Sequence, residues 1–398
     1  MICSPARTIV GKAPAKREQN DARIGSAERE GQVTKAQPKG NVPALRFPEF
    51  TGEWESVLLE DVAEFQKKRI SSDLLNNSNY ISTENILQNF GGVQNSISIP
   101  TNTNVIEYQR GDVLLSNIRP YLKKVWLSDR HGGCSADVFV LRGNQCERRF
   151  LYYVIASDRF INFVMSGAKG VKMPRGDKSQ MEKFAFFIPT NVEQQKIAMF
   201  LSMLDERIRL QNKIIEKLET LIKGVVETVI SIQEPNALIK DCLECNSSTL
   251  QESQVTGNGA YPVYGATGIS GYTETAEENG EAILITKDGS GVGTVKFADG
   301  KYSYIGTLNR LIAREGYCLK YLYFALQGFC FEPYKTGMAI PHIYFKDYGN
   351  AKIYCPPLAE QKRIANVLGK LENKLFLERD ILASFNLQKR YLLGQMFI

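Results

Sequence analysis

Residues 193–208 read EQQKIAMFLSMLDERI, and residues 360–375 read EQKRIANVLGKLENKL. At a constant offset of 167 residues, the two stretches share Glu, Gln, Ile, Ala and two Leu in the same order. The same offset pairs Pro174 with Pro341 and Pro189 with Pro356. Self-similarity at a fixed offset is the mark of a repeated structural unit. The chain is therefore predicted to contain two copies of one unit, a globular part followed by a helix.

The repeat extends into the globular parts with a few residues of slippage. RFLYYVIAS (149–157) resembles KYLYFALQG (320–328), and GDVLLSN (111–117) resembles GEAILIT (280–286). Apolar runs predict strands at 57–65, 111–117 and 184–189 in the first copy, and at 261–268, 281–286 and 351–357 in the second. Helical spacing predicts helices at 148–166 and 318–328. Both globular parts are thus expected to be mixed α/β domains of an α+β protein.

A heptad pattern follows each globular part. In the first copy, apolar residues step by four and three from Ile197 to Val229, and in the second from Ile364 to Met396. One polar residue interrupts each seam at the same place, Gln211 and Glu378, where it can set the register. Each helix of about 38 residues would be roughly 57 Å long, more than a small domain covers. The two helices are therefore expected to pair as a coiled coil, rather than each to cover its own domain. The predicted coiled-coil and partner-docking residues are Ile197, Leu201, Leu204, Ile208, Ile215, Leu218, Ile364, Leu368, Leu371, Leu375, Leu382 and Phe385.

These patterns predict five segments. Residues 1–40 contain eight Lys and Arg against four Asp and Glu, without aromatic residues, and are expected to be a disordered basic tail. A phosphate-binding arm is one interpretation of this tail, and a dispensable extension is the favoured one. The remaining segments are a first globular domain (41–190), a central helix (191–232), a second globular domain (233–357) and a C-terminal helix (358–398).

Composition limits the classes of function. The 398 residues carry a net charge of +6, which permits binding to nucleic acid without establishing it. No apolar run is long enough to span a membrane, so we expect a cytoplasmic protein with reduced thiols. Cys242 and Cys245 form a C-x2-C pair, but a zinc site needs two further ligands, and the chain has only His131 and His342. We therefore expect no metal site.

Positive charge concentrates in one part of the first domain. Residues 110–183 contain 14 Lys and Arg against 7 Asp and Glu, whereas residues 45–109 contain 4 against 9. A local basic surface beside aromatic residues is typical of phosphate contacts. Two loops in each copy, at 116–126 and 166–178 and at 286–297 and 334–347, are therefore candidate DNA contacts. For any single residue a solvated turn is the favoured interpretation, whereas the recurrence of the loops in both copies favours DNA contact for the set. The candidates are Arg119, Tyr121, Lys123, Lys124, Lys169, Lys172, Arg175, Lys178, Lys287, Ser290, Lys296, Lys335, His342 and Lys346.

Taken together, these features resemble the specificity subunit of type I restriction–modification enzymes. The likeness is carried by NVPALRFPEFTGEWESVLLEDVAE (41–64), GDVLLSNIRPY (111–121), the two P-x-x-x-E-Q-x-x-I-A helix starts and the terminal YLLGQMF (391–397). It covers about 41–398 and rests on the doubled architecture more than on one motif. The first helix departs from the second at its end, KGVVETVI.

The resemblance implies that each globular part is a target-recognition domain that reads one half of a split DNA sequence. It also implies that the helices pair antiparallel, set the spacing and dock two methyltransferase subunits, which motor-nuclease subunits then join. S-adenosylmethionine, ATP and magnesium would be bound by those partners, so no cofactor, catalytic residue or membrane contact is expected in this chain.

Two other classes of function were weighed. An adenine methyltransferase needs an N/D-P-P-Y/F loop, and CPPL (355–358) has the wrong first and last residues. GSGVG (289–293) lacks the lysine and following helix of a nucleotide-binding loop. A coiled-coil assembly scaffold without DNA readout remains the alternative, which leaves two large globular parts without a role. Steeply salt-dependent DNA affinity would separate the two.

Overall fold

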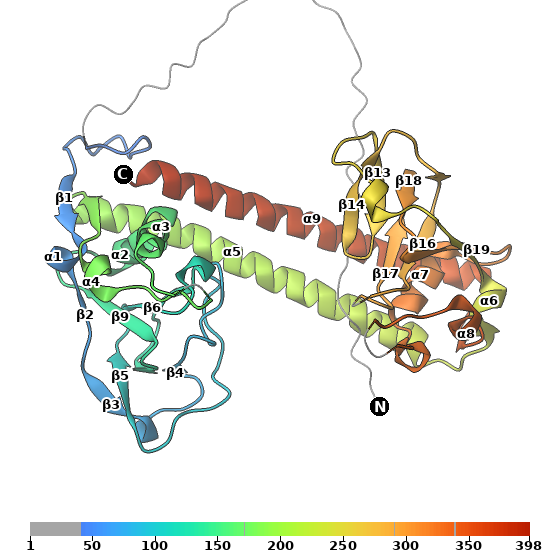
Figure 1. Ribbon diagram of the computed structural model, residues 1–398, viewed down its shortest axis with the longest axis horizontal. Helices are drawn as coiled ribbons and strands as arrows, with labels where there is room; N and C mark the ends of the chain where they lie inside the picture. Colours follow the sequence, from blue (N-terminus) through green and yellow to red (C-terminus); the bar gives the residue numbers. More distant parts are fainter. Residues whose placement is uncertain (1–40, 171, 290, 338–339) are drawn as a thin grey trace, which may run out of the picture. The chain divides into compact units, whose positions relative to one another are not determined.

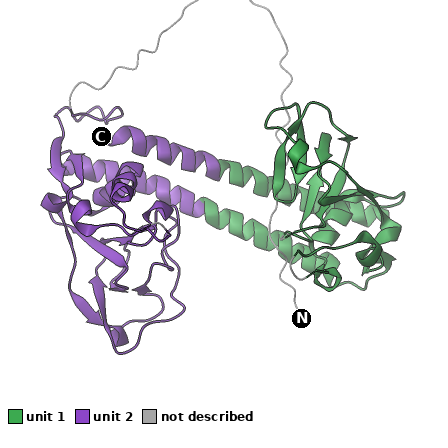
Figure 2. Ribbon diagram, in the orientation of Figure 1, with its two compact units in different colours: residues 1–26, 211–381 green, residues 27–210, 382–398 purple. Residues whose placement is uncertain are grey.

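The computed structural model describes residues 41–170, 172–289, 291–337 and 340–398, so the predicted tail at 1–40 lies outside it. The described chain divides into two compact units (Figure 2). Unit 1 contains residues 211–381, and unit 2 contains residues 41–210 and 382–398. The division cuts through both long helices, so each unit holds one globular domain with a segment of each helix.

Unit 2 contains ten strands and four short α-helices within its described residues (Figure 1). The strands are β1 (Glu55–Leu58), β2 (Ala63–Phe65), β3 (Arg69–Ser71), β4 (Tyr80–Ile81), β5 (Asn104–Tyr108), β6 (Val113–Ser116), β7 (Val125–Leu127), β8 (Gly132–Cys134), β9 (Val138–Gly143) and β10 (Ala185–Ile188). The helices are α1 (Leu59–Val62), α2 (Arg148–Ile155), α3 (Asp158–Ser166) and α4 (Lys178–Glu182), with 3-10 turns η1 (Ser72–Leu74) and η2 (Pro120–Leu122).

Unit 1 contains a similar set within its own described residues. The strands are β11 (Ala237–Leu238), β12 (Leu243–Ser247), β13 (Tyr261–Gly265), β14 (Gly268–Thr273), β15 (Glu278–Asn279), β16 (Ala282–Thr286), β17 (Val295–Ala298), β18 (Lys301–Tyr304), β19 (Leu308–Ala313) and β20 (Lys352–Ile353). The helices are α6 (Ile239–Cys242), α7 (Leu319–Gln327) and α8 (Phe345–Tyr348), with η4 (Glu252–Gln254) and η5 (Glu332–Tyr334). The two long helices are α5 (Asn191–Val226), which continues into the π-helical turn η3 (Glu227–Ser231), and α9 (Leu358–Met396).

The sheets repeat between the units. An antiparallel sheet has the order β2-β9-β6-β7 in unit 2 and β12-β19-β16-β17 in unit 1. A second sheet contains the same parallel pair in both units. In unit 2, β4 pairs parallel with β8, and in unit 1, β13 pairs parallel with β18. Its outer strand differs, because unit 2 adds β3 beside β5 whereas unit 1 adds β14 beside β13. The predicted duplication is therefore present in the backbone, with variation at the edge of one sheet.

Side chains that cap helix N-termini split two of the predicted elements into shorter ones. The expected strand at 57–65 is broken by α1, because the carboxylate of Asp61 accepts the backbone N–H of Leu58 and starts a helical turn. The expected helix at 148–166 is two helices, since the hydroxyl of Ser157 accepts the backbone N–H of Phe160 and begins α3. Both predictions were wrong in this respect. The helix expected at 318–328 is present as α7, with Gly328 at its end.

The repeated glutamine at each long-helix start has the same role in both units. The side-chain amide of Gln194 donates to the Pro189 carbonyl at 2.9 Å and accepts the backbone N–H of Glu147 at 2.9 Å. Gln361 donates to Pro356 at 2.8 Å and accepts the N–H of Cys318 at 2.9 Å. Each glutamine thus ties the start of a long helix to the start of the short helix in its own domain, α2 or α7.

The two long helices run antiparallel within each unit, as predicted (Figure 1). In unit 2, Lys389 of α9 forms an ion pair with Asp205 of α5 at 2.6 Å, and Leu392 and Met396 join the core that holds Leu201. In unit 1, Arg379 of α9 pairs with Glu219 of α5 at 2.6 Å. The predicted coiled-coil residues are all buried or half-buried.

The seam of α5 departs from the heptad pattern at its end. The predicted positions Val225 and Val229 are half-buried, whereas Val226 and Ile230 are buried. Val226 is the last residue of α5 and Ile230 lies in the π-helical turn η3 (Glu227–Ser231), so the buried positions at this end follow Ile222 in steps of four. The most deeply buried positions at this end therefore lie one residue after the predicted ones, which are themselves half-buried.

Candidate nucleic-acid interface

In unit 2, the backbone joins the two loops that the sequence singled out. After β6, the N–H of Arg119 donates to the carbonyl of Pro174 at 2.8 Å, and the N–H of Gly176 donates to Asn117 at 3.1 Å. Lys169 and Arg175 exchange two backbone hydrogen bonds, at 3.0 and 2.9 Å. Residues 117–119, 169 and 174–176 therefore form one surface, which we call the unit 2 loop pair.

Unit 1 repeats this hydrogen-bond pattern. The N–H of Gly289 donates to Pro341 at 3.0 Å, and the N–H of Ile343 donates to Lys287 at 2.9 Å. Thr336 and His342 exchange two backbone hydrogen bonds, at 2.9 and 2.8 Å. We call residues 287–289, 336 and 341–343 the unit 1 loop pair. Each bond has its counterpart in unit 2, so Gly289 takes the place of Arg119 and His342 the place of Arg175.

The loop pairs differ in their side chains on this common frame. Arg119 is exposed, has a left-handed backbone (φ 52°), and makes no side-chain hydrogen bond within the described part of the chain. Tyr121 beside it is 49% exposed. A non-glycine residue at positive φ is uncommon and is held by its surroundings, here by the bond to Pro174. The guanidinium of Arg119 is thus presented to solvent from a fixed backbone.

Four more predicted residues lie on the second loop of unit 2. Lys169 pairs with Asp177 at 2.7 Å, which raises the pKa of Lys169 and lowers that of Asp177. Arg175 pairs with Asp137 at 3.1 Å and remains exposed, as does Lys172. Lys178 begins α4 and lies over the ring of Phe65 at 5.1 Å. Three of the four therefore present positive charge on the exposed side of the loop.

The candidates of unit 1 are less basic. Lys287 and His342 are half-buried, and His342 Nδ1 lies 3.6 Å from the carboxylate of Asp288. Lys335 pairs with Glu332, and Lys346 lies 5.3 Å from the ring of Tyr344. Ser290 lies outside the described residues. The sequence reading missed Asp288, Tyr344 and, in unit 2, Asp137, because only their proximity to the loop pairs distinguishes them from other surface residues.

Lys296 does not fit its predicted role. Its side chain is 2% exposed, and its ammonium donates to the carbonyls of Gly265 and Ala266 at 2.8 and 2.7 Å. Burial lowers its pKa to about 8. Lys296 lies on β17, inside the domain, and its charge serves to hold the turn between β13 and β14. It cannot contact DNA from this position, and we remove it from the interface.

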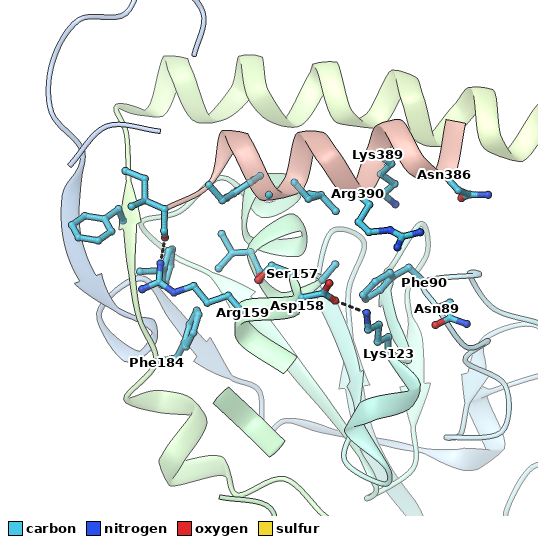
Figure 3. A pocket seen from close by; sticks show the side chains of 18 residues that line it. Asn89, Phe90, Lys123, Ser157, Asp158, Arg159, Phe184, Asn386, Lys389 and Arg390 are labelled. Atoms are coloured by element: carbon cyan, nitrogen blue, oxygen red, sulfur yellow. Dashed lines mark hydrogen bonds and ion pairs between the residues drawn. The ribbon is translucent and has the colours of Figure 1, made fainter. Parts of the chain in front are cut away.

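The ammonium groups of two other predicted lysines have partners outside the unit 2 loop pair. Lys124 donates to the carbonyl of Thr83 at 2.7 Å, and Lys123 forms an ion pair with Asp158. Lys123 lines a cavity of about 730 Å³ between α3 and the end of α9, all within unit 2 (Figure 3). Arg159, Lys389, Arg390 and Phe184 also line it. Neither lysine is placed with the unit 2 loop pair.

The predicted seam residues are buried or half-buried within the chain, and other large apolar side chains of α5 are exposed. In unit 2, Val192, Met199, Met203 and Leu210 are exposed large apolar side chains. The same spacing brings Ile214 and Leu221 to the surface of unit 1. Steps of 7 and 4 sum to the 11-residue period that keeps positions on one side of an α-helix. We call these six residues the α5 stripe.

No helix among the described residues has the length and apolarity that crossing a membrane requires. The same residues contain no group of three or more His, Cys, Asp and Glu side chains that could bind a metal.

The chain is thus of a class with a duplicated mixed α/β domain, in which each copy is followed by a long helix and carries a loop pair on the same backbone frame. The family described as "Type I restriction modification DNA specificity domain" matches residues 51–220 and 238–386. The chain therefore belongs to this family. A comparison with curated proteins gives no match.

Solved structures give the fold comparison. The type I restriction–modification S subunit from M. genitalium is 18% identical, covers 90% of this chain and 99% of its own, and has a TM-score of 0.67. A structure described by the assembly and conformational transition of the type I R-M system is 20% identical over 86% and 97%, with a TM-score of 0.49. The HsdS subunit from Thermoanaerobacter tengcongensis is 20% identical over 86% and 96%, with a TM-score of 0.37. The first of these shows that the chain shares the fold of that S subunit.

Proposed function

We propose that this chain is the DNA-specificity subunit of a type I restriction–modification complex and that each loop pair reads one half of a split DNA target. The observation that carries this proposal is the shared backbone frame with unlike side chains, Arg119 and Arg175 against Gly289 and His342. A constant frame sets the approach to the duplex, and the side chains on it choose the bases. Two different half-sites are therefore expected.

The different charge of the two loop regions supports different contributions of the two units to DNA affinity. Arg119, Lys172 and Arg175 supply exposed cations in unit 2, whereas unit 1 offers Lys287 and His342. Arginine can read guanine through two hydrogen bonds, and each lysine contact to phosphate adds to the salt dependence. Unit 2 would supply more of the electrostatic affinity.

The α5 stripe supports docking of partner subunits. Met199 and Met203 are 57% and 52% exposed, and a row of apolar side chains along a helix marks an interaction surface. Two methyltransferase subunits would bind along the helices, and motor-nuclease subunits would join them. In this proposal the chain itself performs no catalysis and binds no cofactor, since S-adenosylmethionine, ATP and magnesium belong to the partners.

Coexpression with the methyltransferase subunit tests the proposal. Long-read mapping of 6-methyladenine, with and without the chain, is expected to reveal a split motif of two short half-sites around a fixed gap. Methylation that is unchanged by the chain in a soluble complex would instead favour an assembly scaffold without DNA readout.

A further inference from the structure

Two cysteines that are far apart in the sequence meet at the base of the unit 1 domain. The Sγ atoms of Cys242, at the end of α6, and Cys355, two residues after the end of β20, lie 3.7 Å apart. Cys242 is buried, and Cys355 is partly exposed. The sequence pattern had joined Cys242 to Cys245, but the spatial partner of Cys242 is Cys355.

The backbone around both cysteines is well fixed. The side chain of Asn236 accepts the N–H of Cys355 at 2.8 Å and donates to its carbonyl at 3.0 Å. The carbonyl of Cys242 accepts the N–H of Arg314 at 2.9 Å. Next to them, β11 and β20 pair where the chain enters and leaves the domain. A bond between the sulfurs would therefore join the two crossing points of the chain.

The equivalent positions in unit 2 show which side chains are sufficient for packing at the site of the two cysteines. The counterparts of Cys242 and Cys355 are Val62, at the end of α1, and Ile188, at the end of β10. Val62 is buried and Ile188 half-buried, so apolar side chains fill the position in the first copy. Paired thiols are thus a feature of unit 1 that packing does not demand.

We propose that Cys242 and Cys355 form a redox-active dithiol, a modification site that closes to a disulfide by exchange with a small-molecule disulfide such as oxidised glutathione. In the first step, Cys355, the more accessible thiol, displaces one glutathione and forms a mixed disulfide. Cys242 then attacks the Cys355 sulfur and releases the second glutathione. Two protein thiols are oxidised to one disulfide, and one oxidised glutathione is reduced to two thiols.

The local chemistry suits this exchange. Hydrogen bonds from Cys355 and then Tyr317 lower the pKa of Cys242, whereas the same contact and burial raise the pKa of Cys355. Once Cys355 is in the mixed disulfide, Tyr317 is the donor that still stabilises the attacking Cys242 thiolate. The sulfurs, now at 3.7 Å, must approach by about 1.7 Å to reach a disulfide bond length of about 2.0 Å. The bond would close a loop across 113 residues, which restricts the unfolded domain and stabilises the folded one.

The test uses the full chain, equilibrated with mixtures of reduced and oxidised glutathione. Peptide mapping without reductant is expected to show a Cys242–Cys355 link, with the loss of two titratable thiols. The unfolding midpoint of unit 1 is expected to rise by roughly 5–15 °C, and that of unit 2 to stay unchanged. Two free thiols at these positions in the folded chain, a stable glutathione adduct, or a Cys242–Cys245 link would each overturn the proposal.

Matched variants separate the disulfide from general oxidation. Cys242→Val and Cys355→Ile introduce the side chains that unit 2 carries at the same places, so both should fold and neither should gain stability on oxidation. Cys245→Ser should still form the link. Loss of the link in Cys245→Ser, or a midpoint shift that persists in Cys355→Ile, would contradict the assignment. The outcome is independent of DNA methylation, so it can fail while the proposed function holds.

Discussion

Gln211 and Glu378 occupy the same position of the two repeats, 167 residues apart, and are hydrogen-bonded to each other within unit 1. The Gln211 amide donates to the carboxylate of Glu378 and to its backbone carbonyl, the latter at 2.9 Å. Both side chains are 6% exposed, and Lys374 forms an ion pair with the same carboxylate. The polar position of each seam is therefore the partner of the other, which ties the register of α5 against α9.

Replacing one member of this pair should cost more than replacing both. Gln211→Leu removes a partner of the buried carboxylate and is expected to lower the unfolding midpoint of unit 1. The double variant Gln211→Leu with Glu378→Leu should recover stability, because no polar group is then left unpaired. Urea unfolding of the singles and the double, followed as a thermodynamic cycle, measures the coupling. Additive losses would contradict a direct interaction.

Acid should weaken the same pair. Hydrogen bonds from Lys374 and then Gln211 lower the pKa of Glu378 below its ordinary value of 4.5. A carboxyl with a lowered pKa stabilises the fold above that ordinary value, and the contribution is lost as pH falls through the folded-state pKa. Unfolding measured between about pH 6 and pH 3 should therefore show a smaller acid loss in Glu378→Gln than in the natural chain. Equal acid losses would exclude Glu378 as a contributor.

Replacement of Asp112 should strongly destabilise unit 2. Its buried carboxylate binds Arg142 through two hydrogen bonds, at 2.8 and 2.7 Å, and also accepts the N–H of Gln109. Asp112→Ala leaves the partly buried guanidinium of Arg142 without this partner and is expected to cost about 3–5 kcal/mol. Thermal unfolding checks this value.

A control for Asp112 exists in unit 1. Glu278, which is half-buried, pairs with Arg310 at 3.1 Å, and Tyr302 also contacts that guanidinium. Glu278→Ala should cost less than Asp112→Ala, because Arg310 keeps a second partner. A larger loss in Glu278→Ala would show that burial of the carboxylate does not govern the cost.

Lys296 should give unit 1 a stability that rises in alkali. Because burial lowers its pKa to about 8, the unfolded chain holds more protons than the folded one between pH 8 and the ordinary value of 10.5. Stability then increases with pH over this interval. The difference between the natural chain and Lys296→Met isolates this term from tyrosine ionisation. A difference that does not change between pH 8 and 10 would place the ammonium in contact with water.

DNA affinity should separate base contacts from phosphate contacts. Arg119→Ala is expected to weaken binding to the proper half-site by about 1–3 kcal/mol and to relax its specificity. Lys172→Ala should weaken binding to all sequences and reduce the slope of log K against log salt by about 1. Lys124→Ala is the control, because its ammonium binds the Thr83 carbonyl. An unchanged affinity and target in Arg119→Ala would remove Arg119 from the interface.

Partner docking should depend on the α5 stripe. Met199→Asp with Met203→Asp places charge on exposed positions, so the chain should keep its unfolding midpoint and lose affinity for the methyltransferase subunit by 10-fold or more. Leu201, which lies between these two methionines in the sequence, is fully buried, so Leu201→Asp should instead unfold unit 2. Pull-down and thermal unfolding together distinguish these effects. Undiminished binding by the double variant would locate docking elsewhere.

The sequence by itself determined the duplication, the mixed α/β class and the heptad seam of the two long helices. These features follow from short-range periodicity and from an exact offset between copies, which a linear chain records directly. The alternating seam from Ile197 to Leu218 needed no tertiary information, because helical geometry brings those positions to one face. The division of 148–166 into two helices was not predicted. It depends on the hydroxyl of Ser157, which accepts the backbone N–H of Phe160 and so begins a second helix.

Only the tertiary structure decided which side chains of the candidate loops are exposed to solvent and can contact DNA. Lys296 and Arg119 look alike as loop cations in the sequence, but one is buried against two carbonyls and the other faces solvent. Cys242 found its partner in Cys355 rather than Cys245, because β11 and β20 bring distant segments together. Contacts between residues far apart in the chain set burial, and burial decides whether a charge or a thiol can act on a partner.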